Sequence, residues 1–69
     1  MSKIYPLRSS ALKSAEHTDD GALIVTFRDG SRYHYSGVPP ATVTGLLAAK
    51  SAGKFLKETI TGKFKSKKL

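Results

Sequence analysis

The sequence predicts an α+β fold: a small antiparallel sheet of two to three strands, followed by two short helices packed on one of its faces. β-branched and aromatic residues concentrate before residue 36, and apolar residues at helical spacing follow from residue 41. Pro39 and Pro40 separate the two halves. A chain of 69 residues buries only roughly 60% of its unfolded surface. We therefore expect one domain over residues 1–69, with a basic tail from about residue 63.

The first half predicts the strands. Residues 9–16 alternate loosely between polar and apolar side chains, which is typical of a short edge strand. Residues 17–21 form a turn, because Asp20 can bond its own backbone and Gly21 supplies a positive φ. Residues 22–27 are rich in β-branched and aromatic side chains and give the clearest strand. Residues 28–31 reverse the direction of the chain, and residues 32–35 return as the second arm of a hairpin. Whether the first strand pairs with this hairpin stays open.

The turn after Phe27 has two possible forms. In a two-residue loop, Arg32 and His34 share a face with the large apolar side chains. In a three-residue loop with Gly30 left-handed, those two polar residues point to solvent. Burying a large apolar side chain contributes about 1.5–3 kcal/mol, and desolvating a guanidinium is costly, so we favour the second form. Its inward face carries Leu23, Val25, Phe27, Tyr33 and Tyr35, and its solvent face carries Ile24, Thr26, Arg32 and His34.

The second half predicts two helices. Pro40 suits a first helical turn, and residues 41–50 follow helical spacing with an apolar stripe. Ser51 is a suitable N-cap for a second helix through about Thr59, and Gly62 ends it. The last residues, 63–69, are expected to be frayed or extended. The side chains expected to be buried are Val43, Leu46 and Leu47 in the first helix, and Phe55, Leu56 and Ile60 in the second.

Positive charge is concentrated at the C-terminus. The net charge is +7, and residues 54–69 contribute most of it with six lysines against Glu58 alone. Such asymmetry indicates a polyanionic partner, because phosphates neutralised along a basic stretch release counterions. A merely solubilising tail explains it equally well.

The order of motifs resembles the KTSC domain. Ser9-Ser10-x-Leu12, Leu23-x-Val25-x-Phe27, Tyr33-x-Tyr35 and Gly37-Val38-Pro39 occur in sequence, followed by Ser51-x-Gly53-Lys54-Phe55 and Lys63-Phe64. The resemblance covers residues 9–65 and implies a small bacterial or phage protein, or a module from the C-terminus of some lysyl-tRNA synthetases. It marks Tyr33-His34-Tyr35 as the hallmark and implies RNA binding. The chain departs from the family in lacking an aromatic near His17 and in having Leu56 after Phe55.

These observations predict a binding module for nucleic acid, RNA rather than DNA. Arg32 and His34 supply contacts from the sheet, and Phe64 docks on the core between exposed lysines. Tyr33 and Tyr35 can stack on unpaired bases, but the register favours a mainly structural role for them. The lysines expected to contact the phosphate backbone are Lys54, Lys57, Lys63, Lys65, Lys67 and Lys68. The alternative partner is an acidic protein, on which the chain acts as an accessory factor.

Other function classes have little support. Two histidines, no cysteine and no nucleophile motif argue against an enzyme. Gly53-Lys54 lacks the remaining residues of a phosphate loop, and His17, Asp19 and Asp20 lie within one turn without a ligand partner at metal-site spacing. We expect no cofactor, no metal and no membrane association. With no signal peptide evident near the N-terminus, a cytoplasmic monomer is expected.

Overall fold

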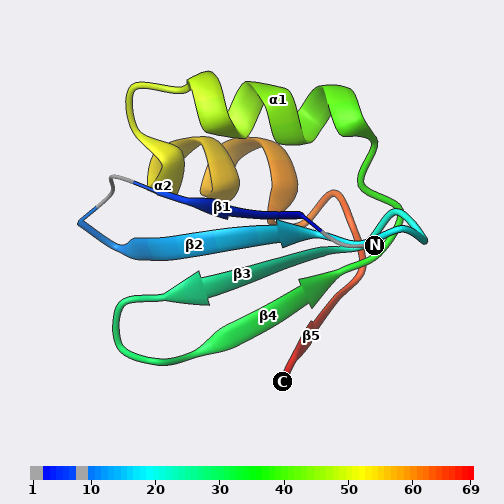
Figure 1. Cartoon of the computed structure of the whole chain (residues 1–69), viewed down its shortest axis with the longest axis horizontal. Coiled ribbons are helices and arrows are strands. Elements are labelled where there is room, and N and C mark those ends of the chain that lie inside the picture. Colours follow the sequence, from blue (N-terminus) through cyan, green and yellow to red (C-terminus); the bar gives the residue numbers. More distant parts are fainter. Residues whose placement is uncertain (1–2, 8–9) are drawn as a thin grey trace.

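The computed structural model describes residues 3–7 and 10–69 as a five-stranded antiparallel sheet with helices on one face (Figure 1). The helical layer consists of α1 (Pro40–Ala48) and α2 (Ala52–Phe55), which continues into a π-helical turn, η1 (Leu56–Ile60). The strands lie side by side in chain order: β1 (Lys3–Pro6), β2 (Leu12–His17), β3 (Leu23–Phe27), β4 (Arg32–Tyr35) and β5 (Ser66–Lys68). The α+β class is confirmed, and the expected two to three strands are corrected to five.

The two strands that the sequence did not predict form the two edges of the sheet. β1 contains Pro6, and β5 is rich in lysine. Prolines and lysines are depleted in strands generally but are accepted at edges, where one side of the backbone faces solvent. β2 therefore lies between β1 and β3 rather than at an edge. The expected strand 9–16 began at residue 9, which lies outside the described residues.

The β3–β4 hairpin has the three-residue form. The Phe27 N–H donates to the Ser31 carbonyl at 2.7 Å, and Val25 lies opposite Tyr33. Gly30 has φ +94°, a backbone conformation that L side chains adopt only with strain. The predicted register is confirmed. It directs Leu23, Val25 and Tyr35 into the core, where each is buried.

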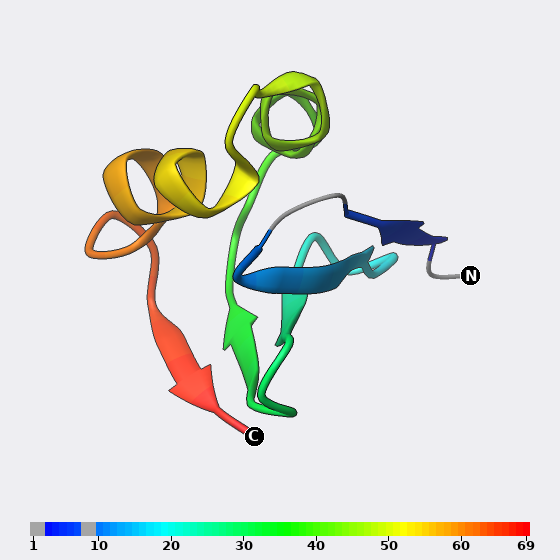
Figure 2. The same cartoon turned by 90° about the vertical axis from the view of Figure 1, so that its left-hand side faces the viewer.

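The core lies between the inner face of the sheet and the helical layer (Figure 2). Its largest completely buried side chains come from both layers and from the segment before α1: Leu12, Leu23, Val25, Val38, Leu46 and Ile60. Leu47 was expected to be buried but is 38% exposed, because α1 turns it toward an open hollow beside β1. No helix within the described residues is long and apolar enough to cross a lipid bilayer.

The helix boundaries follow local sequence signals. Pro40 occupies the first turn of α1, and the Ser51 hydroxyl caps α2 by accepting the Lys54 N–H at 3.3 Å. α1 and α2 approach closely at Gly45, where a Cβ would lie 2.9 Å from Cζ of Phe55. A glycine at this position therefore allows the two helices to pack over the sheet.

The C-terminal segment turns back to the sheet after η1. Gly62 makes this turn with φ +84°, and Phe64 packs half-buried against the core. The Ser36 N–H then donates to the Lys65 carbonyl at 2.9 Å, and the Leu69 N–H donates to the Arg32 carbonyl at 2.8 Å. Backbone hydrogen bonds at both ends of β5 thus hold the lysine-rich tail on β4 as an extended strand.

Candidate nucleic-acid interface

β5 lies directly beside the strand that carries Tyr33-His34-Tyr35. The register places Lys67 opposite His34 and Lys68 opposite Tyr33. Side chains alternate between the two faces of a strand, so Lys67 shares the outer face with His34, and Lys68 shares the inner face with Tyr33. The edge of the sheet thus carries positive charge toward both faces.

We call Arg32, His34, Lys65, Lys67 and Lys68 the basic edge. Arg32 and His34 are two residues apart and therefore share the outer face with Lys67. Arg32 is exposed and His34 is half-buried. All three lysines are exposed. The structure brings these five predicted contact residues together on or beside two adjacent strands.

The outer face becomes apolar and acidic away from the basic edge. The row that begins with Lys67 and His34 continues through Ile24 and Glu16 to Ile4 on β1. Ile4 is 67% exposed. The helices cover the opposite face only (Figure 2). An anionic ligand on the outer face is therefore favoured at the β4–β5 end and disfavoured near Glu16.

Asp20, in the turn between β2 and β3, has a lowered pKa. Its pKa is lowered chiefly by the hydroxyl of Thr18, which donates to the carboxylate, and by a backbone hydrogen bond with Ala22. The positive charge of His34 lowers this pKa further. The carboxylate of Asp20 thus stays ionised at neutral pH.

A hollow of about 430 Å³ opens on the inner face between the hairpin and β5. Phe27 and Tyr33 form its aromatic wall, with ring centroids 5.4 Å apart and planes inclined at 71°. Tyr33 is half-buried, whereas Tyr35 is 3% exposed. The residues that line the hollow are Phe27, Asp29, Ser31, Tyr33, Tyr35, Thr61 and Ser66. We call it the aromatic hollow.

The acidic member of the aromatic hollow is held ionised. The Ser31 N–H donates to Asp29 at 2.9 Å, and hydrogen bonding by Ser31 is the main cause that lowers the Asp29 pKa. The charge of Lys68 lowers this pKa further, so the lysine lies within electrostatic reach of the hollow. Composition and spacing did not reveal this site, because it forms only once β5 pairs with β4.

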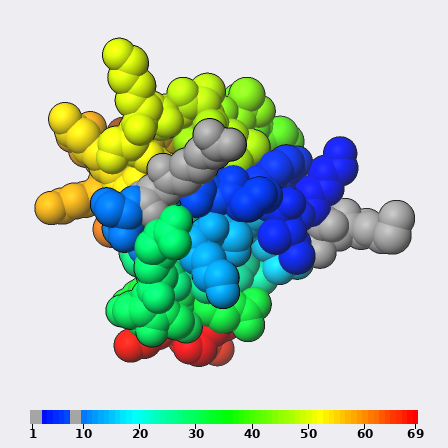
Figure 3. Space-filling model, turned by 60° about the vertical axis from the view of Figure 1, so that its left-hand side comes forward, coloured from blue at the N-terminus to red at the C-terminus, as the bar shows by residue number. Residues whose placement is uncertain are grey.

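Three predicted contact residues lie away from the basic edge. Lys54 belongs to α2 and Lys57 to η1, and both are exposed on the helical layer. Lys63 is exposed in the turn between η1 and β5. In Figure 3 the yellow-to-orange residues of the helical layer lie at the upper left and the red C-terminal strand lies at the bottom, with the green hairpin between them. Lys54 and Lys57 thus belong to the helical layer and not to the basic edge, and Lys63 lies in the turn between the two.

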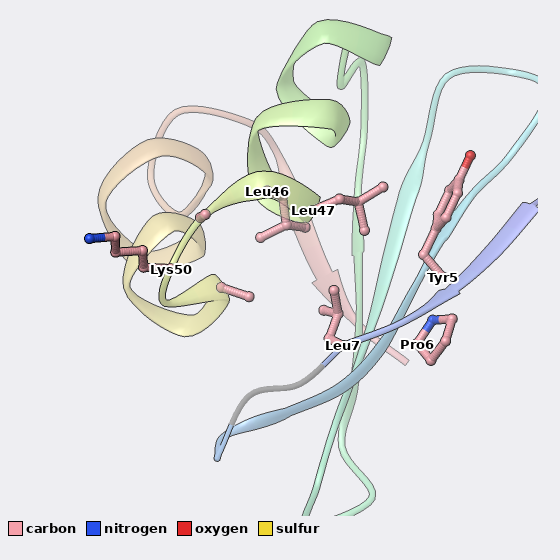
Figure 4. A pocket seen from close by; sticks show the side chains of 8 residues that line it. Tyr5, Pro6, Leu7, Leu46, Leu47 and Lys50 are labelled. Atoms are coloured by element: carbon pink, nitrogen blue, oxygen red, sulfur yellow. The ribbon is translucent and has the colours of Figure 1, made fainter.

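A second hollow, of about 500 Å³, lies between β1 and the end of α1. Figure 4 shows Leu46 and Leu47 from α1 above Leu7, with Tyr5 and Lys50 on opposite sides. We call it the β1–α1 hollow. None of the predicted contact residues lines it.

The turn at residues 17–20 is occupied by local bonds. His17 Nε2 lies 3.1 Å from the carbonyl oxygen of Val38, and the Thr18 hydroxyl donates to Asp20. Within residues 3–7 and 10–69, no group of three or more histidine, cysteine or acidic side chains is arranged to hold a metal ion. The turn thus joins β2 and β3 and connects them, through Val38, with the start of the helical half.

The fold is that of a small two-layer α+β domain with one open sheet face and a basic edge strand. The chain belongs to the KTSC domain family, whose model matches residues 8–64. The structure resembles the crystal structure of a KTSC domain protein from Yersinia pestis, with TM-score 0.92, 31% identity, and coverage of 100% of this chain and 99% of that one. A protein of Tsukamurella paurometabola, described without any named activity, is 34% identical over 64 residues, covering 91% of this chain and 96% of its own length. The resemblance predicted from the sequence motifs is confirmed.

Proposed function

We propose that the protein binds single-stranded nucleic acid, RNA in preference to DNA, along the basic edge. The observation that carries this proposal is the pairing of β5 with β4, which puts Lys67 beside His34 and Lys68 beside Tyr33. Lysines that follow one strand can track a phosphate backbone, and aromatic side chains nearby can stack on its unpaired bases. Proteins that read RNA by sequence mostly target such unpaired segments.

The two basic groups have unequal roles in this proposal. The basic edge makes the phosphate contacts, whereas Lys54 and Lys57 on the helical layer raise only the general positive potential. Each phosphate contact on a single strand contributes about 0.7 to the slope of log affinity against log salt concentration. Neutralising two contacting lysines should therefore lower that slope by about 1.4.

Fluorescence anisotropy with labelled RNA and DNA oligonucleotides, measured over a range of salt concentrations, tests the proposal. Lys67→Gln/Lys68→Gln should lower both the affinity and the slope. Lys54→Gln/Lys57→Gln removes the same charge and should leave the slope nearly unchanged. Binding that is absent or independent of salt contradicts the proposal, and equal effects of the two double variants contradict its location.

A second candidate function is docking on an acidic protein, and the β1–α1 hollow favours it. Leu47 is an exposed apolar side chain there, and Lys50 lies at the same site. A single acidic partner, recovered after nuclease treatment and lost with Leu47→Ser, would support this function. Recovery unchanged by Leu47→Ser would exclude this hollow as the docking site.

A further inference from the structure

We propose that the aromatic hollow binds one unpaired guanine base, stacked on Tyr33 with its amino edge toward Asp29. The inference rests on the proposed function, because it places a base of the same bound strand. The hollow has a volume of about 430 Å³, within the range of roughly 300–1,000 Å³ that small-molecule sites occupy.

The aromatic wall supplies the stacking surface. Phe27 meets Tyr33 edge to face, so Phe27 supports the tyrosine ring without stacking flat on it. Tyr33 is half-buried and lines the hollow. Tyr35 is almost completely buried and forms the adjoining wall. A base against Tyr33 extends an existing aromatic pair and needs no rearrangement of the core.

The polar groups of the hollow select the base. The Asp29 carboxylate accepts one hydrogen bond from the Ser31 N–H, and an ionised carboxylate has further acceptor sites on both oxygens. Guanine presents two adjacent donors, N1–H and the 2-amino group, on its Watson–Crick edge. Adenine, uracil and cytosine each lack such a pair of adjacent donors, so the carboxylate favours guanine.

Lys68 makes this acidic hollow compatible with a polyanion. It lies opposite Tyr33 in the strand pair, and its charge acts on Asp29. A strand that follows β5 can place a phosphate near Lys68 while the attached base enters the hollow. Ser66 and Thr61 line the same hollow and offer hydroxyl groups to the remaining edges of the base.

The test compares five-residue RNAs that differ only at the central base: UUGUU, UUAUU, UUCUU, UUUUU and the inosine analogue UUIUU, which lacks the 2-amino group. The affinities are measured with the wild-type protein and three variants. Tyr33→Leu should weaken UUGUU binding about fivefold to 150-fold, the range for loss of one stacked base. Tyr33→Phe should retain binding, and Tyr5→Leu, the same change in the β1–α1 hollow, should leave it unaltered.

Base selection has its own readout. The wild-type protein should bind UUGUU more tightly than UUIUU and UUUUU, and Asp29→Asn should remove that preference. Circular dichroism and thermal unfolding verify that each variant is folded. Equal, salt-dependent binding of all five RNAs would overturn the guanine site and leave the proposed function standing. Failure of every RNA to bind would overturn both.

Discussion

Lys67 lies opposite His34 in the pairing of β5 with β4. One residue comes from the lysine-rich tail and the other from the centre of Tyr33-His34-Tyr35. The pairing turns two separate sequence features into one surface. It also implies that removing β5 should affect binding much more than folding.

Deleting residues 66–69 should therefore weaken nucleic-acid binding at least as much as Lys67→Gln/Lys68→Gln, with little loss of stability. All of these residues are exposed. Each backbone hydrogen bond of β5 contributes about 0.5–1.5 kcal/mol net, which is offset by about 1–2 kcal/mol of entropy for ordering each residue. We expect the thermal midpoint to fall by less than about 8 °C. The deletion exposes the edge of β4, and an exposed edge strand can aggregate, so light scattering should be measured alongside thermal unfolding. A variant that no longer folds would contradict the expectation.

Gly45→Ala should destabilise the fold. An added Cβ would lie 2.9 Å from Cζ and 3.2 Å from Cε2 of Phe55, and overpacking costs about 1–3 kcal/mol. The gain in helix propensity, about 1 kcal/mol, offsets part of this cost. Chemical denaturation should show a net loss of up to about 2 kcal/mol.

The double variant Gly45→Ala/Phe55→Leu is the control for this clash. The smaller side chain at position 55 should relieve the clash, so the added methyl should no longer destabilise the helix pair. Additive effects of the two substitutions would show that the clash is not the cause.

Gly30→Ala should weaken the β3–β4 hairpin. Gly30 has φ +94°, and a Cβ added there would meet nothing within 4 Å, so the penalty is backbone strain rather than crowding. Strain of this kind costs about 1–3 kcal/mol. Chemical denaturation should show a loss of unfolding free energy of that size. Ser31→Ala is the control, because it adds no strain to the backbone of the turn. An unchanged unfolding free energy would mean that the turn does not need this φ.

The carboxylate of Asp20 should titrate below its ordinary pKa of 3.8, mainly because the Thr18 hydroxyl donates to it. A lowered folded-state pKa contributes stability that is present above the ordinary pKa and is lost as the pH falls through the folded one. Carbon-13 NMR of the Asp20 carboxyl should show this low midpoint. Thr18→Val should move the midpoint upward, and a midpoint unaltered by that change would contradict the assigned cause.

The strands and helices that bury apolar side chains were predictable from the sequence, because their apolar residues recur at strand or helix spacing. Apolar side chains alternate along β3, and Tyr33 and Tyr35 alternate along β4. Together they determine the hairpin register, since the other register would bury Arg32. The N-cap at Ser51 and the turn at Gly62 are likewise local signals. Leu47 departs from its helical pattern because, within residues 3–7 and 10–69, the β1–α1 hollow in which it lies stays open.

The edge strands and the candidate site were harder to predict. β5 contains no apolar residue, so its position depends on backbone bonds to β4 that no side-chain pattern encodes. The sequence identified Arg32, His34 and the tail lysines as candidates but not that Lys67 and Lys68 face opposite sides. It also gave no sign that Asp29 and Ser66 line one hollow with Tyr33, because these residues meet only through the pairing of β5 with β4.

The central claim is that nucleic acid binds along the basic edge, and an NMR amide-shift titration with short single-stranded RNA tests it most directly. The account predicts salt-sensitive shifts concentrated at Arg32, His34 and residues 65–68, with weaker changes at Lys54 and Lys57. Shifts confined to the β1–α1 hollow, around Leu47 and Lys50, or no shifts at all, would contradict it.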